Sequence, residues 1–377
     1  MSRAASPAAE PPLRRLPPAG RWGVLLAASA LAAAVLQAIR LPAGLLLGPL
    51  AAAVVVQTAG GTVKVPRALM MGAQAVIGCL IARAITAPIL AGFARHWLVI
   101  LTVVVLSLSG GAAIGWAMSR LRIVRGTTAV WGMLPGAATA MMVMAEAYGA
   151  DVRLVAFMQY LRVVMVAAVA SIVALLFAHG GGPRFPGGYF PPLDLASFAE
   201  TVAVGCVGAG LGLVSRIPAG VLLGPLALGG VLNVLGLIRI ELPPVLLIAS
   251  YALVGWNTGL RFTRDVLAAA ARALPQCLGA TALLMTFCGV LAWMLTALLH
   301  VDPLTAYLAT SPGGADAAAI IAASTKVDTP FVMSLQIVRV VVILAFGPQL
   351  ARWAAGTLEP GAERPVAPEP LDLGDVD

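Results

Sequence analysis

Two arginines stand deep inside long apolar stretches of this chain of 377 residues. Each follows a glutamine by three residues, as Gln159-x-x-Arg162 and Gln336-x-x-Arg339, so amide and guanidinium share one face of a helix. Each arginine comes eight residues into its apolar segment, which places it about 12 Å along a helix and near the middle of a bilayer core. A guanidinium at that depth must face a cavity, a partner or a substrate, and it prefers carboxylate or phosphate groups.

Two interpretations of these arginines are open, and they can coexist. In the first, Arg162 and Arg339 bind a small anion that the two glutamines orient. In the second, each arginine makes a structural pair with a carboxylate, for which Asp316 and Glu146 are the candidates, or with backbone carbonyls freed by a helix break.

A break is predicted in each half because a proline and glycines interrupt an otherwise apolar segment. The interruptions are Pro135-Gly136 and Pro312-Gly313-Gly314. Proline removes a backbone donor and glycine lets the chain turn, so both favour a broken helix. The N-terminus of a half-helix can bind an anion, and we expect these residues to belong to the site. Close helix packing is expected instead for another group of glycines: Gly44, Gly48, Gly220 and Gly224.

Asp316 is the clearest candidate for a buried carboxylate, because it follows Gly314 by two residues. It could carry a proton, coordinate a coupling cation or neutralise Arg339. The corresponding residue of the other half is Thr139, the second candidate for ion coupling, so the two half-sites are chemically unequal.

Composition places these residues in a membrane protein. The chain is 60% hydrophobic and 11% charged, too few charges to cover a soluble domain of this size. We therefore exclude a soluble enzyme and a disordered chain. Apolar segments long enough for helices in lipid lie at 22–39, 41–60, 66–82, 97–119, 127–147, 154–178, 196–215, 217–237, 243–260, 274–300, 304–325 and 331–355.

The two halves of the chain repeat one another. Residues 41–50 read LPAGLLLGPL and residues 217–226 read IPAGVLLGPL. Further on, Asp151 and Asp328 also recur 177 residues apart, as do the glutamines and arginines, and both aspartates are expected to cap helices. The predicted organisation is a tail (1–21), repeat 1 (22–178), a Gly/Pro-rich linker (179–195), repeat 2 (196–355) and an acidic tail (356–377).

The distribution of Lys and Arg favours one topology. If 127–147 and 304–325 each enter and leave on one side, more positive residues lie inside than if all segments span. The predicted fold is therefore all-α and polytopic, with two inverted repeats of about five spans and one re-entrant or broken helix each. The N-terminus is expected in the cytoplasm, and the segments at 41–60 and 217–237 are the rival places for the break.

Several classes of function are disfavoured. The net charge of +8 is spread over short loops, so no direct contact with nucleic acid is expected. No Walker-type phosphate loop is present, which disfavours transport driven by ATP. The 4 cysteines and 3 histidines form no cluster with ligand spacing, so neither a metal site nor a cofactor is expected, and we do not expect an enzyme.

The repeated LPAG-x-LLGPL segments, the Pro-Gly segments and residues 149–163 (GADVRLVAFMQYLRV) resemble the AbrB-type integral membrane proteins of bacteria. The resemblance covers about residues 22–355. Members often carry the label of a regulator, which implies an influence on gene expression, or of an ammonia monooxygenase, whose copper or iron ligands this chain does not offer. The duplicated plan is similar to that of inverted-repeat anion and sodium/proton antiporters.

Two hypotheses follow for a multi-pass protein of the bacterial inner membrane. The first is a secondary transporter of a small organic anion, alternating access around a midplane site. Arg162, Arg339, Gln159 and Gln336 would bind the anion, and Asp316 would couple a proton or cation. The second is a membrane sensor or regulator that alters gene expression through a partner. The bilayer is the expected partner in both, and the sequence leaves homo-oligomerisation open.

Overall fold

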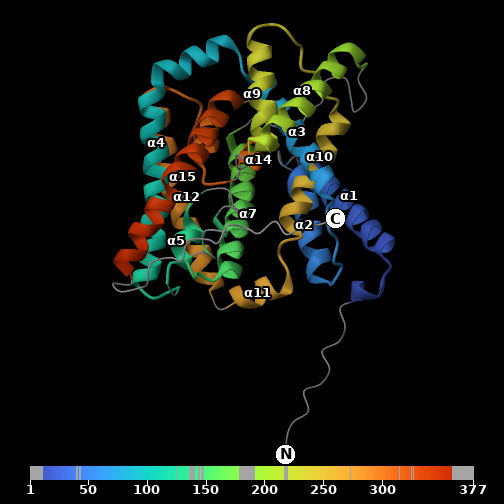
Figure 1. Ribbon diagram of the computed structural model, residues 1–377. Coiled ribbons are helices and arrows are strands. Elements are labelled where there is room, and N and C mark those ends of the chain that lie inside the picture. Colours follow the sequence, from blue (N-terminus) through green and yellow to red (C-terminus); the bar gives the residue numbers. More distant parts are fainter. Residues whose placement is uncertain are drawn as a thin grey trace, which may run out of the picture. The chain divides into compact units, whose positions relative to one another are not determined.

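The structure is a computed structural model, and it describes most of the chain. The described residues are 12–39, 41, 44–124, 126–135, 141–142, 145, 148–177, 192–215, 220–271, 273–313, 315–323, 325 and 327–358. Within these ranges the chain forms helices and turns and no strand, from the 3-10 turn η1 (Pro12–Arg15) to helix α15 (Thr329–Leu358) (Figure 1). The predicted all-helical fold is confirmed.

Six of the described helices are long and apolar enough to cross a membrane by length and composition. They span Pro18–Ala38, Arg67–Ala84, Trp97–Arg120, Val152–Ala174, Leu195–Val214 and Leu274–Leu299. These lengths match the thickness of a hydrocarbon core, about 30 Å at 1.5 Å per residue. The chain is therefore a polytopic membrane protein.

The chain divides into two compact units, and each unit takes helices from both sequence repeats. Unit 1 comprises Met1–Ile85, Ser171–Asp265 and Ala323–Lys326, and unit 2 comprises Thr86–Ala170, Val266–Ala322 and Val327–Asp377. In Figure 1 blue helices accordingly share unit 1 with yellow ones, and cyan or green helices share unit 2 with orange and red ones.

Unit 1 contains equivalent triplets of helices from the two repeats. They are α1 (Pro18–Ala38), α2 (Gly44–Thr58) and α3 (Arg67–Ala84), and α8 (Leu195–Val214), α9 (Gly220–Val234) and α10 (Pro244–Gly259). Helix α1 packs on α2 as α8 packs on α9, while α2 contacts α10 and α3 contacts α9. Both α2 and α9 continue through an internal proline, so within the described residues the rival LPAG segments are not broken.

Glycines let the helices of unit 1 approach at equivalent places in both repeats. A Cβ on Gly78 of α3 would lie 3.1 Å from the Cβ of Pro225 in α9, and one on Gly255 of α10 would lie 3.3 Å from that of Pro49 in α2. The glycines expected to serve packing also face neighbouring backbone; a Cβ on Gly48 would lie 2.5 Å from the nitrogen of Ala33. The packing prediction is confirmed for these positions.

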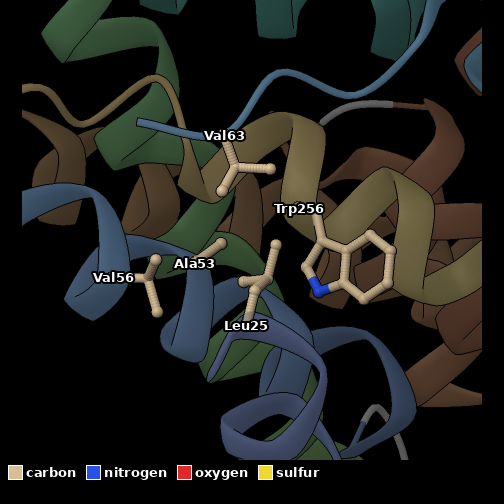
Figure 2. Packing of buried hydrophobic residues seen from close by; sticks show 5 residues of the cluster. All are labelled: Leu25, Ala53, Val56, Val63 and Trp256. Atoms are coloured by element: carbon tan, nitrogen blue, oxygen red, sulfur yellow. The ribbon is translucent and has the colours of Figure 1, made fainter. Parts of the chain in front are cut away.

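A small apolar cluster fastens α1 to α2 and α10. Figure 2 shows its five buried members, which are Leu25, Ala53, Val56, Val63 and Trp256. The indole nitrogen of Trp256 donates to Ser29 Oγ (2.8 Å), and Ser29 donates to the carbonyl of Leu25 (2.6 Å). The polar atom of the tryptophan is thus satisfied inside an apolar setting, as buried polar groups require.

Unit 2 holds the broken segments. Its described helices are α4 (Ala87–Arg120), α5 (Thr128–Met133), most of α7 (Val152–Phe177) and α11 (Arg264–Ala270), α12 (Leu274–Leu299), α13 (Pro303–Thr310), α14 (Ala315–Ala323) and α15. Helix α5 packs on α4, and α13 packs on α12 and α15. The gap between α13 and α14 falls at the predicted Pro-Gly-Gly break.

Each broken segment returns to the point where it begins. The backbone nitrogen of Asp151 donates to Thr128 Oγ1 at 3.1 Å, and that of Asp328 donates to Thr305 Oγ1 at 3.2 Å. The residue just before the long helix that follows is therefore bonded to the first turn of the broken segment, so the two ends of each segment lie side by side.

Both aspartates at these junctions cap the helices that follow them. Asp151 Oδ1 accepts from the nitrogens of Arg153 (3.0 Å) and Leu154 (3.2 Å), and Asp328 Oδ1 accepts from the nitrogen of Phe331 (3.0 Å). The expected capping role is confirmed for both residues.

Two glycines of α8 provide a matched test of the packing. A Cβ on Gly208 would lie 2.5 Å from the backbone nitrogen of Pro225, whereas one on Gly210 would meet nothing within 4 Å. Because backbone cannot yield easily, Gly208→Ala should lower the free energy of unfolding by about 1–3 kcal/mol. Gly210→Ala should be neutral or slightly stabilising. Thermal unfolding of both purified variants in one detergent measures this, and equal melting temperatures would contradict the close contact.

Candidate functional site

The site is built around two helix ends that are buried in unit 2. Helices α5 and α13 stop at Met133 and Thr310, and the next residues, Leu134 and Ser311, turn to extended backbone with ψ of 119° and 138°. A proline follows each, which disfavours helical backbone at the preceding residue. The last carbonyls of each helix therefore lack partners within it. Leu134 and Ser311 are each 1% exposed, so water cannot satisfy them.

A glutamine from the neighbouring long helix satisfies two of these carbonyls in each repeat. Gln159 Nε2 donates to the carbonyls of Trp131 (2.8 Å) and Leu134 (3.1 Å). Gln336 Nε2 donates to those of Leu308 (2.9 Å) and Ser311 (3.3 Å). Both glutamines are fully buried. The amide therefore replaces the helical donors that the proline interrupts.

The arginine one turn further along binds the same helix end. Arg162 Nη1 donates to the carbonyl of Leu134 (3.0 Å), and its Nη2 donates to Gln159 Oε1 (2.7 Å). A positive charge at this end also complements the negative pole of the helix dipole.

The second repeat builds the same arrangement with one more bond. Arg339 Nη1 donates to the carbonyl of Ser311 (2.5 Å), and its Nη2 donates to the carbonyl of Gly313 (2.7 Å) and to Gln336 Oε1. Equivalent residues thus make equivalent bonds in both repeats. This is the expected pairing of the arginines with backbone carbonyls at a break.

These hydrogen bonds leave the two positive charges unneutralised, because carbonyl and amide oxygens carry no net charge. Arg162 is 2% exposed and Arg339 is 4% exposed. The Nε atoms of the two arginines are buried and have no acceptor among the described residues. Among the described residues the arrangement is therefore a pair of buried cations, each with an unpaired Nε–H donor.

The other predicted site residues divide by what the structure describes. Pro135, Pro312 and Gly313 are buried at the breaks, and Gly313 supplies a carbonyl to Arg339. A Cβ on Gly313 would lie 2.8 Å from Val166 Cγ1, so this glycine also permits close packing.

The remaining predicted residues fall outside this description. Gly136, Thr139, Glu146 and Gly314 lie outside the described residues, and Asp316 lies in the first turn of α14 with its side chain outside them. The roles predicted for these residues in binding or coupling stay predictions.

Sequence reasoning predicted carbonyl acceptors at a break, but it did not identify which carbonyls these are or that the glutamines also bind them. The carbonyls of Trp131, Leu134, Leu308 and Ser311 carry no side-chain signature, and their role depends on where the helix stops. The hydrogen bonds from Asp151 and Asp328 to Thr128 and Thr305 do have a sequence signature, because the two threonines recur at the same spacing as the arginines. Thr310 adds a further tie by donating to the carbonyl of Cys288 in α12 (3.1 Å).

Comparison with known proteins connects the chain to one group. The family model described as "Transition state regulatory protein AbrB" matches residues 45–355. A protein of Escherichia coli (strain K12) named "Putative regulator AbrB" is 40% identical over 338 residues, which cover 89% of this chain and 97% of that protein. No solved structure matches the chain.

Removing either glutamine should destabilise the helix ends. In Gln159→Leu or Gln336→Leu two buried carbonyls and one guanidinium lose a partner, so we expect the free energy of unfolding to fall by about 2–4 kcal/mol in each variant. Thr102→Val is the control, because the hydroxyl of Thr102 bonds only one carbonyl of its own helix on an exposed face. The measurement is thermal unfolding in detergent. Glutamine variants as stable as Thr102→Val would refute the bonding scheme.

Proposed function

This chain belongs to the AbrB family of membrane proteins, and on that premise we propose that it is a secondary transporter of a small organic anion. The observation that carries the proposal is the pair of buried guanidinium groups in unit 2, whose described hydrogen bonds all go to neutral oxygens. An unneutralised charge in a low-dielectric interior is costly, so an anionic ligand stabilises the pair. Guanidinium groups bind carboxylates with charge-assisted hydrogen bonds.

The repeated architecture supports alternating access. Both broken segments return to their own starting points, which agrees with segments that enter and leave the membrane on one side. Five full spans per repeat would then invert the second repeat relative to the first, and the site would lie near the bilayer midplane. Arg162 and Arg339 bind the anion in this scheme. Gln159 and Gln336, whose amide donors are taken by carbonyls, hold the two guanidinium groups in place, so they orient the anion only through the arginines. The breaks are shaped by Pro135, Gly136, Pro312, Gly313 and Gly314.

Coupling is assigned to Asp316 in the proposal. It lies in the first turn of α14, directly after the second break. A carboxylate there can take up a proton or a cation, and Thr139 in the other repeat offers a hydroxyl oxygen to a cation, so the two half-sites contribute unequally to coupling. The protein works in the inner membrane with its N-terminus in the cytoplasm, and it needs no cofactor, no catalytic step and no nucleic acid.

Flux measurements test the proposal. In proteoliposomes carrying an ion gradient, the protein should accumulate at least one of the radiolabelled probes acetate, lactate, succinate and citrate. Arg162→Gln and Arg339→Gln should each reduce that flux by at least about tenfold, because each removes charge-assisted bonds to the anion. Arg120→Gln is the control, since Arg120 lies exposed in the last turn of α4. Full flux in both buried-arginine variants, at unchanged protein yield, would contradict the proposal.

A regulatory role is the second candidate, because the matched family model and the Escherichia coli relative are both described as regulators. In this role the membrane unit senses a ligand and passes the signal through a partner. The terminal segments outside the described residues would contact that partner.

Deletion of residues 1–11 and 359–377 separates the two roles. The deletion must stop before η1, because Arg21 donates to the carbonyls of Arg14 (2.9 Å) and Leu16 (3.0 Å). A transporter should keep its flux in the deletion variant. A regulator should lose its effect on transcript levels, measured by comparing strains that carry the intact chain, the deletion or no copy. No flux in the intact chain, together with a transcript effect that the deletion abolishes at an unchanged melting temperature, would favour the regulatory role.

A further inference from the structure

In unit 2 the buried side-chain atoms that lack a partner among the described residues are all donors or can act as donors. They are Nε of Arg162 and of Arg339, the indole nitrogen of Trp131, and the hydroxyls of Tyr307, Ser119, Thr281 and Thr296. Native proteins leave few buried donors unsatisfied, and each one needs an explanation. A missing group that supplied only acceptors would explain this set.

The two arginines are the part of this set that carries charge. Their Nη1 atoms donate to the carbonyls at the helix ends, whereas the Nε atom of each arginine has no acceptor among the described residues. Gly313, whose carbonyl accepts from Arg339 Nη2, lies against Val166, which is one turn beyond Arg162 in α7, so the two half-sites adjoin. Every hydrogen bond that the described residues accept from the two guanidinium groups goes to a neutral oxygen, so a ligand with one negative charge would leave one of the two positive charges without a described counter-charge.

We infer that the transported anion is divalent and that its two charges are shared between Nε–H of Arg162 and Nε–H of Arg339. The inference rests on the proposed function and names its substrate class. The ligand chemistry is a small dianion with oxygen acceptors, either a dicarboxylate or a tetrahedral oxyanion such as phosphate or sulfate. Both kinds offer oxygens that accept from a guanidinium edge.

The two arginines make equivalent hydrogen bonds in the two repeats, and this equivalence is the physical reason to expect two negative charges on the ligand. Each repeat supplies one arginine whose Nη atoms donate to a half-helix end and whose Nε has no acceptor among the described residues. A site assembled from two such units presents the same donor twice. An anion that neutralises both has one charge for each repeat.

Binding to the purified full-length protein tests this with matched ligands. Succinate and succinamate have nearly the same size, but succinamate carries an amide in place of one carboxylate. Isothermal titration calorimetry should give a dissociation constant at least about tenfold lower for succinate. Sulfate and inorganic phosphate form the parallel arm, and tighter binding of either than of succinate would also support a dianion while assigning the tetrahedral class.

Variants locate the two charges. Arg162→Gln and Arg339→Gln should each reduce the preference for succinate over succinamate to less than about twofold, because one charge then remains. Arg120→Gln and Asp316→Asn should keep the preference. Asp316→Asn removes the carboxylate that lies nearest to the second break in sequence. The preference should survive this change because the inference assigns both positive charges to the ligand and none to Asp316.

Three results would overturn the inference. Equal affinity of the parent protein for succinate and succinamate, together with flux of a monocarboxylate, would show that the substrate need not be divalent. The proposed function of anion transport would still hold. A preference that emerges only in Asp316→Asn would show that Asp316 neutralises one arginine. No binding and no flux of any probe would overturn the inference and the proposed function together. The first two results need only the parent chain and Asp316→Asn, so they stand even where an arginine variant fails to fold.

Discussion

Buried carbonyl groups at the ends of two interrupted helices are the constraint on which unit 2 depends. In water such ends are solvated, but α5 and α13 stop where almost no side chain is exposed. Lipid offers no donors, so the protein must supply them. A glutamine and an arginine one turn apart on the neighbouring helix do so in both repeats. The Pro-Gly interruption and the Gln-x-x-Arg motif are therefore two parts of one structural device.

The same hydrogen-bonding scheme does not neutralise the two guanidinium charges, and these charges connect the fold with the proposed function. Satisfying the carbonyls uses the Nη atoms of Arg162 and Arg339, but it does not neutralise either cation. If the only task were to bond carbonyls, neutral donors would serve at a lower cost of desolvation. In the proposed function, the cost of burying two guanidinium groups is offset by a ligand that carries negative charge. In unit 1 the described helices meet through glycines, apolar contacts and neutral hydrogen bonds such as that from Trp256 to Ser29.

The sequence predicts the local features well and the long-range ones poorly. The caps at Asp151 and Asp328, the packing glycines and the break before α14 follow from residue types and spacing, because their physical causes lie within a few residues. The carbonyl acceptors of Trp131 and Leu308 could not be predicted, since any residue supplies a carbonyl. The division into units that mix both repeats also lies beyond local patterns, because it depends on which distant helices pack together.

The central claim is that Arg162 and Arg339 form one anion site while they hold the helix ends. A structure of the full chain in lipid nanodiscs, determined with and without saturating succinate, tests it most directly. The account predicts one dicarboxylate that accepts from Nε of both arginines, with the Nη atoms still on the carbonyls of Leu134 and Ser311. A structure in which a protein carboxylate such as Asp316 occupies both Nε atoms, with or without succinate, would contradict it.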